Sequence, residues 1–239
     1  MGRAFEYRKE RKFARWGAMA KAFTKIGKEI AMAVKEGGSD AAYNPRLRAA
    51  FQSAKKVNMP KATVESSLKK ATSKDAENYQ EVVYEGYGQH GIAVMVETTT
   101  DNPTRTVANI RVHFNKTGGT LGNSGSVDFM FTRKAVFRVK KEAMPNYEDL
   151  EFEMIDFGLD EIKVEEDEII IYCNFTDFGN MQKFLEEKGI EIEESSLERI
   201  PTTTKKLTDE QAESVIKLVE RLEEDDDVSN VFTTMDMSE

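Results

Sequence analysis

The apolar residues of this 239-residue chain have only a helical spacing in its first part and include strand-like alternation after it, and this difference constrains the fold more than any other feature. Between residues 18 and 71, apolar side chains recur with the period of amphipathic helices. After the polar stretch 72–80, they alternate with the period of half-buried strands, and helical segments lie in between. The sequence therefore predicts an all-helical N-terminal part followed by domains that combine strands and helices.

Three helices are expected in the N-terminal part. The first runs from Ala18 to Glu36 and ends at the glycine pair 37–38, because glycine tolerates the left-handed exit of a helix. The second begins with Asn44 as its cap and Pro45 in its first turn, and the third begins at Pro60. We expect their apolar faces to pack into a small bundle with cationic outer faces.

The rest of the chain contains two sets of strands and helices. Residues 134–200 carry the order strand, helix, strand, strand, helix, strand, which is that of a ferredoxin-like unit. Residues 79–133 carry two strands, a helix and a further strand at Val127–Phe131, and residues 201–239 add one helix and one strand. Because this last pair has no partner of its own, the simplest solution combines it with residues 79–133.

The expected fold class is therefore α+β. An N-terminal three-helix domain is followed by two α/β-sandwich domains of the ferredoxin-like type, and the last of these is inserted into the middle one. The expected boundaries are 1–78 for the basic helical domain with its N-terminal arm, 79–133 plus 201–239 for the discontinuous middle domain, and 134–200 for the inserted domain.

Charge is distributed unevenly along the chain. Residues 1–74 contain 18 Lys and Arg against 6 Asp and Glu, whereas residues 75–239 contain 16 against 37, within a net charge of −9. Such asymmetry indicates a segment that binds polyanions, joined to domains that repel them.

The first 16 residues mix six cations with four aromatic side chains and show no sustained apolar period. Because cations neutralise phosphates and aromatic rings stack on unpaired bases, we interpret this segment as an arm that becomes ordered on nucleic acid. The alternative is a solvated tail whose aromatic residues pack on neighbouring helices. These aromatic residues are Phe5, Tyr7, Phe13 and Trp16.

The candidate nucleic-acid-binding residues are cations of the arm and of the three helices, together with one arginine in the helix that Asn102 caps. A charged face is usually only a solvated face, so the prediction depends on the excess of one sign. The candidates are Arg3, Arg8, Lys9, Arg11, Lys12, Arg15, Lys21, Lys25, Lys28, Arg46, Arg48, Lys55, Lys56, Lys61 and Arg105.

A glycine-rich loop, residues 118–126, follows the helix that Asn102 caps. The loop lacks Gly-Lys-Ser/Thr and precedes a strand, whereas a P-loop leads into a helix N-terminus. A Rossmann fingerprint is also missing. Two interpretations remain: a structural turn that closes the core of the middle domain, or a binding loop that acts with Arg105, Arg111 and Lys116.

Patterns typical of catalysis or metal binding are missing from the sequence. Cys173 is the only cysteine, which excludes an intrachain disulfide, and its apolar neighbours predict a buried strand position. His90 and His113 form no His-x-x-x-His pair, and residues 225–227 lack the alternating ligands of a calcium loop and are interpreted as an acidic turn that ends a helix. We expect no enzymatic activity, no cofactor, no metal and no small-molecule substrate.

The sequence also predicts where the protein acts. It contains no run of about 18 apolar residues, and its N-terminus lacks the apolar region of a secretory signal. We therefore expect no membrane contact and a cytoplasmic location.

Several short motifs resemble, in chain order, those of the YebC family, which also includes the mitochondrial translational activator of cytochrome c oxidase. They are Phe23-Thr24-Lys25, Asn44-Pro45-Arg46-Leu47-Arg48, Asn58-Met59-Pro60-Lys61, Tyr84-Glu85-Gly86-Tyr87-Gly88, Asp101-Asn102-x-x-Arg105-Thr106, Gly118-Gly119-x-Leu121-Gly122, Gly125-Ser126-Val127 and Asp226-Asp227-Val228-x-Asn230-Val231-Phe232. The resemblance implies a three-domain cytoplasmic protein, a probable transcriptional regulator that binds DNA. Some members are instead linked to the ribosome and to relief of stalling at proline-rich stretches.

The resemblance also bears on single residues. Among the matched motifs, Lys25, Arg46, Arg48 and Lys61 are the cations that it implies as phosphate contacts, and Arg105 is added to them. Family members commonly begin with a Gly/Ala-His-Ser-Lys-Trp segment, whereas this chain begins with Gly2-Arg3-Ala4-Phe5, which indicates a divergent branch. The expected function is a non-enzymatic regulator of gene expression that binds DNA or RNA, with the ribosome as the alternative target.

Overall fold

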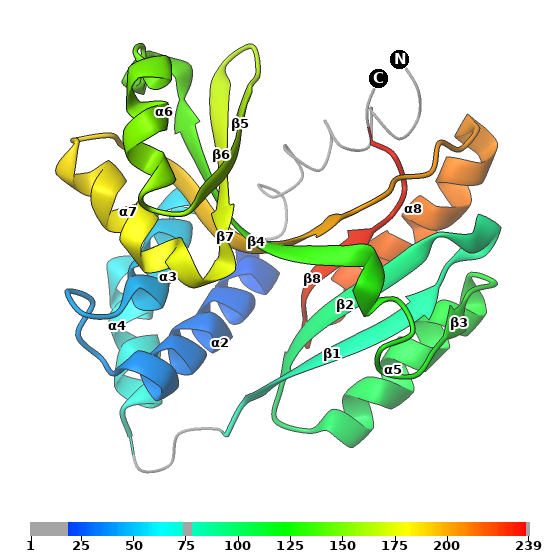
Figure 1. The fold of residues 1–239 in the computed structure, drawn as a ribbon. Coiled ribbons are helices and arrows are strands. Elements are labelled where there is room, and N and C mark those ends of the chain that lie inside the picture. The colour runs from blue at the N-terminus through cyan, green and yellow to red at the C-terminus, as the bar shows by residue number, and fades with distance from the viewer. Residues whose placement is uncertain (1–18, 74–77, 238–239) are drawn as a thin grey trace. The chain divides into compact units, whose positions relative to one another are not determined.

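A computed structural model describes residues 19–73 and 78–237 (Figure 1). The chain divides into two compact units. The first unit comprises Met1–Met32, Met59–Thr132 and Pro201–Glu239, and the second comprises Ala33–Asn58 and Arg133–Ile200. The expected N-terminal arm, residues 1–16, lies outside the described residues.

Three helices form in the N-terminal part, as the apolar period predicted. They are α2 (Met19–Gly37), α3 (Pro45–Lys56) and α4 (Lys61–Ala71). The sequence also predicts that Val64 and Leu68 of α4 point inward, and both are only half-buried. The reason is that α4 carries no other large apolar residue with which to fill a deeper groove.

The start of α3 confirms Asn44 as its cap. The Asn44 Oδ1 accepts a hydrogen bond from the Leu47 amide at 3.0 Å. Its Nδ2 donates to the carbonyl oxygens of Ala33 at 2.7 Å and Gly38 at 2.8 Å. One buried side chain therefore satisfies both a free amide of α3 and carbonyl groups at the end of α2.

The first unit contains a four-stranded sheet with the order β3-β1-β2-β8 (Figure 1). Its strands are β1 (Gln80–Tyr87), β2 (Ala93–Thr100), β3 (Thr120–Leu121) and β8 (Val228–Thr233). Strand β8 pairs antiparallel with β2, so the final strand of the chain completes a sheet that begins almost 150 residues earlier, at Gln80. The expected domain boundaries stay a prediction.

Helices α5 (Pro103–Lys116) and α8 (Asp209–Glu223) cover one face of this sheet. Their apolar residues share one core with alternate residues of β2, because successive strand residues point to opposite faces. The central members of this core are Ile92, Val94, Val96, Ile110, Phe114, Val215, Leu218 and Val219.

Both helices begin at the predicted caps. The Asn102 side chain accepts from the Arg105 amide at 3.1 Å. At the start of α8, Thr208 Oγ1 accepts from the Gln211 amide at 3.4 Å, and the Thr208 amide donates to Gln211 Oε1 at 3.2 Å. The order Thr208-x-x-Gln211 in the sequence predicts such a reciprocal pair, which is a capping box.

The expected strand at Val127–Phe131 is wrong. Residues Asp128–Met130 form a short 3₁₀ helix, and strand β4 (Phe131–Lys140) begins only after it. The amides of Val127 and Asp128 donate to the carboxylate of Glu85 at 2.7 and 2.9 Å, so they are not available to a strand ladder. The edge of the first sheet is formed instead by the two-residue strand β3.

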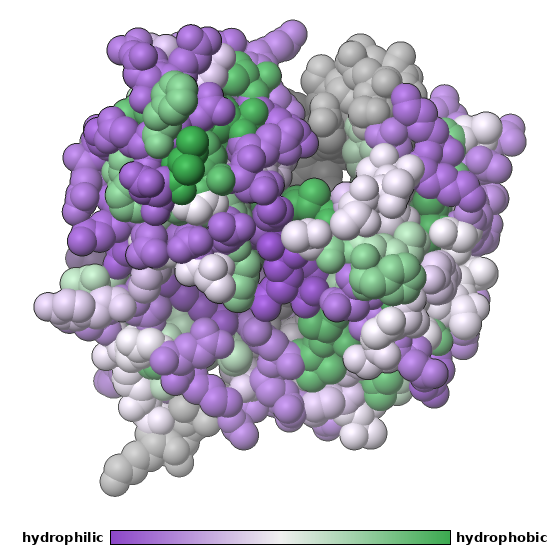
Figure 2. All heavy atoms as spheres, viewed as in Figure 1, coloured by the Kyte–Doolittle hydropathy of each residue, from purple (hydrophilic) through white to green (hydrophobic). Residues whose placement is uncertain are grey.

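The second unit has the predicted ferredoxin-like order. Strands β4, β5 (Leu159–Val164), β6 (Glu168–Asn174) and β7 (Ile192–Pro201) form a sheet with the order β5-β6-β4-β7. Helices α6 (Tyr147–Ile155) and α7 (Phe178–Glu187) pack on one face of it. Three further 3₁₀ helices form among the described residues. One lies in the first unit, at Gln89–Gly91, and two lie in the second unit, at Lys141–Ala143 and Phe175–Asp177. Figure 2 shows apolar residues in green between hydrophilic ones over α6.

Candidate nucleic-acid interface

The candidate cations fall into three groups. Those of the arm lie outside the described residues, and they are Arg3, Arg8, Lys9, Arg11, Lys12 and Arg15. A second group belongs to the first unit, and its members are Lys21, Lys25, Lys28, Lys61 and Arg105. A third group lies on α3 in the second unit, and its members are Arg46, Arg48, Lys55 and Lys56.

Three lysines of α2 form a row on one face of the helix, with the spacing of successive turns. Lys21 donates to the carbonyl oxygen of Glu224 at 3.1 Å, and Lys25 donates to that of Glu223 at 3.0 Å. These carbonyls lie at the C-terminal end of α8, which lacks intrahelical donors and carries the negative end of the helix dipole. Two members of the lysine row (Lys21, Lys25 and Lys28) therefore cap the end of α8, and the third, Lys28, binds the residues that follow it.

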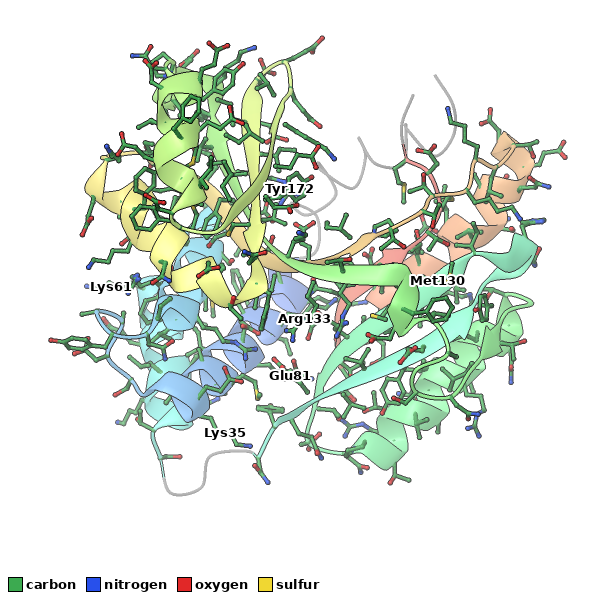
Figure 3. The ribbon with its side chains drawn as sticks, in the orientation of Figure 1. Lys35, Lys61, Glu81, Met130, Arg133 and Tyr172 are labelled. Atoms are coloured by element: carbon green, nitrogen blue, oxygen red, sulfur yellow. The ribbon has the colours of Figure 1, made fainter. Side chains whose placement is uncertain are left out.

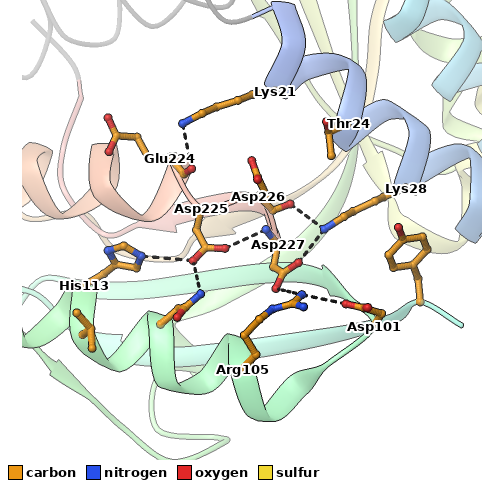
Figure 4. Close-up of a pocket in the computed structure, with 13 residues that line it drawn as sticks. Lys21, Thr24, Lys28, Asp101, Arg105, His113, Glu224, Asp225, Asp226 and Asp227 are labelled. Atoms are coloured by element: carbon orange, nitrogen blue, oxygen red, sulfur yellow. Dashed lines mark hydrogen bonds and ion pairs between the residues drawn. The ribbon is translucent and has the colours of Figure 1, made fainter. Parts of the chain in front are cut away.

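Asp227 lies at the centre of a network of ion pairs and hydrogen bonds (Figure 4). Lys28 Nζ lies 2.8 Å from its Oδ1, and Arg105 Nη2 lies 2.8 Å from its Oδ2. Thr106 Oγ1 donates to the same Oδ2 at 2.8 Å. Only 4% of Asp227 is exposed. This residue therefore joins α2, α5 and the segment between α8 and β8.

The ionised form of Asp227 is strongly favoured. Burial by itself would raise the pKa of this carboxyl group. The hydrogen bonds from Lys28, Arg105 and Thr106, and the charge of Lys28, outweigh burial and lower the pKa to about 2. The hydrogen bonds that Arg105 donates to Asp227 and to Asp101, together with the charge of Asp227, raise the pKa of Arg105 above its ordinary value.

A cleft of about 790 Å³ opens beside the acidic turn, which we define as Glu224–Asp227 (Figure 4). His113 Nε2 lies 3.4 Å from Asp225 Oδ2, and Asn109 Nδ2 donates to the same oxygen at 3.2 Å. The lining includes three lysine or arginine side chains and five carboxylates. Because the carboxylates outnumber these cations, this cleft repels phosphate in the arrangement described.

The low pKa of Asp227 leads to a testable pH dependence. Its ordinary value is 3.8 and its value in the folded protein is about 2, so the carboxylate stabilises the fold above about pH 4, and this contribution is lost as the pH falls toward 2. Between these limits, the native chain is expected to lose about 2 kcal/mol more unfolding free energy than the Asp227→Asn variant. Urea denaturation at a series of pH values measures this difference, and identical pH profiles for both chains would contradict it.

The cations of α3 also have acidic or carbonyl partners, with one exception. Arg46 lies 2.7 Å from Glu36, and Lys56 lies 2.9 Å from Glu194. Arg48 donates to carbonyl oxygens of residues 41 and 42 at 2.9 and 3.1 Å. Lys55 is exposed. Exposed ion pairs contribute little stability and can be exchanged for phosphate contacts.

Lys61, at the start of α4, is labelled in Figure 3, and its side chain is 90% exposed. It lies 3.8 Å from Glu65 one turn later, which is a weak pair in water. Lys69 and Lys70, in the last turn of the same helix, are exposed as well. Helix α4 therefore presents cations whose charge remains available to a polyanion.

One buried carboxylate, that of Glu85, accepts hydrogen bonds from the backbone of the glycine-rich loop and of the residues after it. Glu85 Oε1 accepts from the Gly125 amide at 2.7 Å, and Oε2 accepts from the amides of Val127 and Asp128. Glu85 is 5% exposed. Arg105 is paired with Asp227, so the predicted cooperation of this arginine with the loop has no support. These contacts favour the interpretation of the loop as a structural turn.

Two glycines of the matched motifs are required by the packing of Phe114. A Cβ atom at Gly86 would lie 2.6 Å from the Thr120 carbonyl oxygen and 2.8 Å from the Phe114 ring. A Cβ atom at Gly119 would lie 2.8 Å from the Tyr87 carbonyl oxygen. Glycine is therefore needed for the backbone to approach this buried ring closely.

Other reactive groups among the described residues are structural. Cys173 is buried in β6, as predicted, and burial raises the pKa of its thiol to about 12. Within residues 19–73 and 78–237, no cluster of three or more His, Cys, Asp or Glu side chains could hold a metal ion. No helix in the same ranges is long and apolar enough to cross a membrane.

Sequence reasoning missed the roles of Asp227 and Glu85. Asp227 stands in a run of acids, and nothing in the run distinguishes it from its neighbours. The sequence contained a signal for the role of Glu85, because Glu85 shares a strand face with Val83, which packs on an apolar cluster. An acid on such a face indicates a buried carboxylate that needs hydrogen-bond donors.

Comparison with known proteins assigns the chain to a family. One family model, the TACO1/YebC protein N-terminal domain, matches residues 3–74, and a second, the TACO1/YebC second and third domain, matches residues 79–235. The chain belongs to the TACO1/YebC family. A probable transcriptional regulatory protein of Porphyromonas gingivalis is 57% identical over 98% of this chain and 97% of its own length.

Two further comparisons agree with this assignment to the TACO1/YebC family. A probable transcriptional regulatory protein of Campylobacter curvus is 44% identical over 99% of this chain and all of its own length. The crystal structure of a conserved hypothetical protein from Aquifex aeolicus superposes with a TM-score of 0.80 at 38% identity, covering 91% of this chain and 90% of that one. The α+β fold class and the family resemblance are therefore confirmed, and at the family level the chain is a regulator.

Proposed function

We propose that this chain is a non-enzymatic regulator of gene expression that binds nucleic acid through its N-terminal part. The observation that carries the proposal is the charge of residues 1–74, where 18 Lys and Arg stand against 6 Asp and Glu. The names of the curated relatives, probable transcriptional regulatory proteins, support a role in regulation. Neutralisation of phosphates by such cations supplies most of the affinity of proteins for nucleic acid.

We propose phosphate contacts for each part of the chain by itself: the cations of the arm, the exposed cations of α4 in the first unit, and the exposed cations of α3 in the second. Lys61 represents the first unit and Lys55 the second, because both side chains are exposed to solvent. The lysine row of α2 and Arg105 are already bound to the end of α8 and the acidic turn. Mutations at those positions would therefore combine a loss of stability with any loss of binding.

DNA is the first target that we propose, because the curated relatives are named as transcriptional regulators. Ribosomal or transfer RNA is the second, and the aromatic residues among the cations of the arm favour it, since aromatic rings stack on unpaired bases. In the second case, the chain would act in the cytoplasm as a translation factor. Lysine and arginine contact phosphate in both polymers, so the charge pattern alone does not separate them.

Charge reversal at exposed lysines tests the phosphate contacts. We expect Lys55→Glu and Lys61→Glu each to lower the slope of log affinity against log salt by about 1, because each removes a cation that displaces a counterion. The affinity of the full chain for a nucleic-acid duplex and for a single strand is measured by fluorescence anisotropy at several salt concentrations.

Lys183→Glu is a matched control for Lys61→Glu. Lys183 is 72% exposed and lies 3.6 Å from Glu187 one turn later, much as Lys61 does with Glu65. It belongs to the acidic part of the chain, so its reversal should leave the slope unchanged. An equal effect of all three variants, or an affinity that does not depend on salt, would exclude phosphate binding by the N-terminal helices.

The two targets are separated by a parallel experiment on one protein preparation. Co-sedimentation with ribosomes at moderate salt is measured beside binding to promoter fragments. Association with ribosomes alone would remove the transcriptional form of the proposal, and binding to promoter fragments alone would remove the translational form. Binding to neither would leave a regulator that acts only through proteins and would end the nucleic-acid proposal.

A further inference from the structure

Helix α6 exposes two large apolar side chains that its core does not need. Phe152 is 79% exposed and Ile155 is 57% exposed. Met154 is fully buried and Leu150 packs on the same core, so the inner face of α6 is already occupied. Because successive helical residues are rotated by about 100°, Phe152 and Ile155 lie together on the opposite, outer face.

The surroundings of these apolar side chains are acidic. Residues 142–168 contain twelve Asp and Glu and a single lysine, Lys163. On the exposed face of α6, the apolar pair is flanked by acids of the helix and by the acid that follows its last residue. These acids are Glu148, Asp149, Glu151 and Asp156, and all four are exposed.

An apolar centre within a ring of one charge is typical of a recognition surface, because the apolar contact supplies affinity and the charge selects the partner. Phosphates would be repelled by this helix, so nucleic acid does not fit it. A polypeptide with the opposite charge does fit, provided that it also carries an apolar side chain to cover the phenyl ring.

We infer that the outer face of α6 is a docking surface for a basic protein segment, rich in Lys and Arg, that carries an aliphatic or aromatic anchor. We call it the α6 surface, and it consists of Glu148, Asp149, Glu151, Phe152, Ile155 and Asp156. The inference goes beyond the proposed function, since it concerns a protein partner and residues that belong to the acidic part of the chain. The regulator would then bind nucleic acid with its basic part and a basic protein with its acidic part.

The test uses the full chain and two synthetic peptides of equal length and equal positive charge, one of lysine and leucine and one of lysine and serine. We expect the lysine–leucine peptide to bind about tenfold more tightly, and Phe152→Ser to remove most of that difference. The double variant Glu148→Lys/Glu151→Lys should weaken both peptides, because it removes the charge attraction. Fluorescence anisotropy of labelled peptides gives the affinities.

Phe129→Ser is the matched control. Phe129 is 73% exposed, close to the value for Phe152, but it lies in the first unit outside the acidic segment. Its replacement should leave the affinity for both peptides unchanged. Because Phe152 contributes little to the core, its replacement should also leave the unfolding curve unchanged, which shows that any loss of binding is local.

Four outcomes would overturn the inference. Equal affinity for both peptides would mean that α6 recognises charge alone. An equal effect of Phe129→Ser and Phe152→Ser on peptide binding would mean that the effect is not specific to α6. Self-association of the native chain in sedimentation velocity, abolished by Phe152→Ser, would make a second copy of this chain the occupant. A loss of nucleic-acid affinity in Phe152→Ser would place the α6 surface in the nucleic-acid interface. If the lysine variants left the salt dependence of nucleic-acid binding unchanged while the lysine–leucine peptide still bound α6, the proposed function would be removed and the α6 inference would remain.

Discussion

Replacing Asp227 with asparagine is expected to lower the free energy of unfolding by about 3 kcal/mol. The substitution keeps the size of the side chain and the hydrogen bond from Thr106, but it removes the charge between Lys28 and Arg105. The side chain of Lys28 is only 11% exposed, so its ammonium group would remain in a poorly solvated position without a carboxylate. An uncompensated charge of this kind costs more than the lost ion pair contributed.

Asp101→Asn is the matched control for this variant. Asp101 accepts from the same Arg105 nitrogen at 2.9 Å, but its side chain is 48% exposed. Removing an exposed charge should cost less than about 1 kcal/mol. Equilibrium denaturation in urea measures both variants. If Asp227→Asn were as stable as Asp101→Asn, the network around the acidic turn would contribute only as a surface ion pair.

Replacing Glu85 with glutamine is expected to cost about 2 to 3 kcal/mol and to release the glycine-rich loop. The carboxylate accepts three amide hydrogen bonds from residues 125, 127 and 128. Glutamine offers one oxygen and one NH₂ group, so at least one of these buried amides would face another donor. The variant should therefore lose both stability and the fixed geometry of the loop.

Hydrogen exchange and denaturation together measure the Glu85 variant. The amides of Gly125 and Val127 should exchange faster, while amides in the second unit should keep their protection relative to global unfolding. Glu81→Gln is the control, because Glu81 lies on the same strand and is exposed (Figure 3). Unchanged exchange at Gly125 in the Glu85 variant would show that the carboxylate does not hold the loop.

These two carboxylates explain why motifs that resemble a binding site have a structural role. Glu85 belongs to the Tyr-Glu-Gly-Tyr-Gly motif, and Asp227 to the closing acidic motif. Glu85 organises the glycine-rich loop, and Asp227 joins α2 to α5 through Lys28 and Arg105. A test of nucleic-acid binding is therefore cleaner at Lys55 and Lys61 than at the charged residues of these networks.

Helix ends were the part of the fold that sequence predicted best. Asn44, Asn102 and Thr208 cap their helices through amides only three residues away, so the relevant interactions lie within a short window. Strand β8 was predicted by a different argument, because a lone strand needs a sheet to satisfy its backbone. Both arguments hold without knowledge of the tertiary structure.

The strand that the sequence predicted at residues 127–131, and that does not form, shows the limit of local patterns. Its residues have strand-like composition, but the Val127 amide bonds to Glu85, which lies 42 residues earlier in the chain. A charged acceptor with a short hydrogen bond competes well with a ladder of neutral ones. No window around residue 127 contains that information.

The candidate nucleic-acid-binding residues also separate into features that the sequence determined and features that only the structure decided. Apart from the strand expected at residues 127–131, the sequence by itself determined the order of the main helices and strands, the helix caps and the excess of cations in residues 1–74, because each depends on composition or on neighbours in the chain. Only the tertiary structure decided that Lys21, Lys25, Lys28 and Arg105 are bound to the end of α8 and the acidic turn, while Lys55 and Lys61 are exposed to solvent. The physical reason is that a charge is paired by whatever the fold brings within about 4 Å, and for the lysine row that partner lies almost 200 residues away.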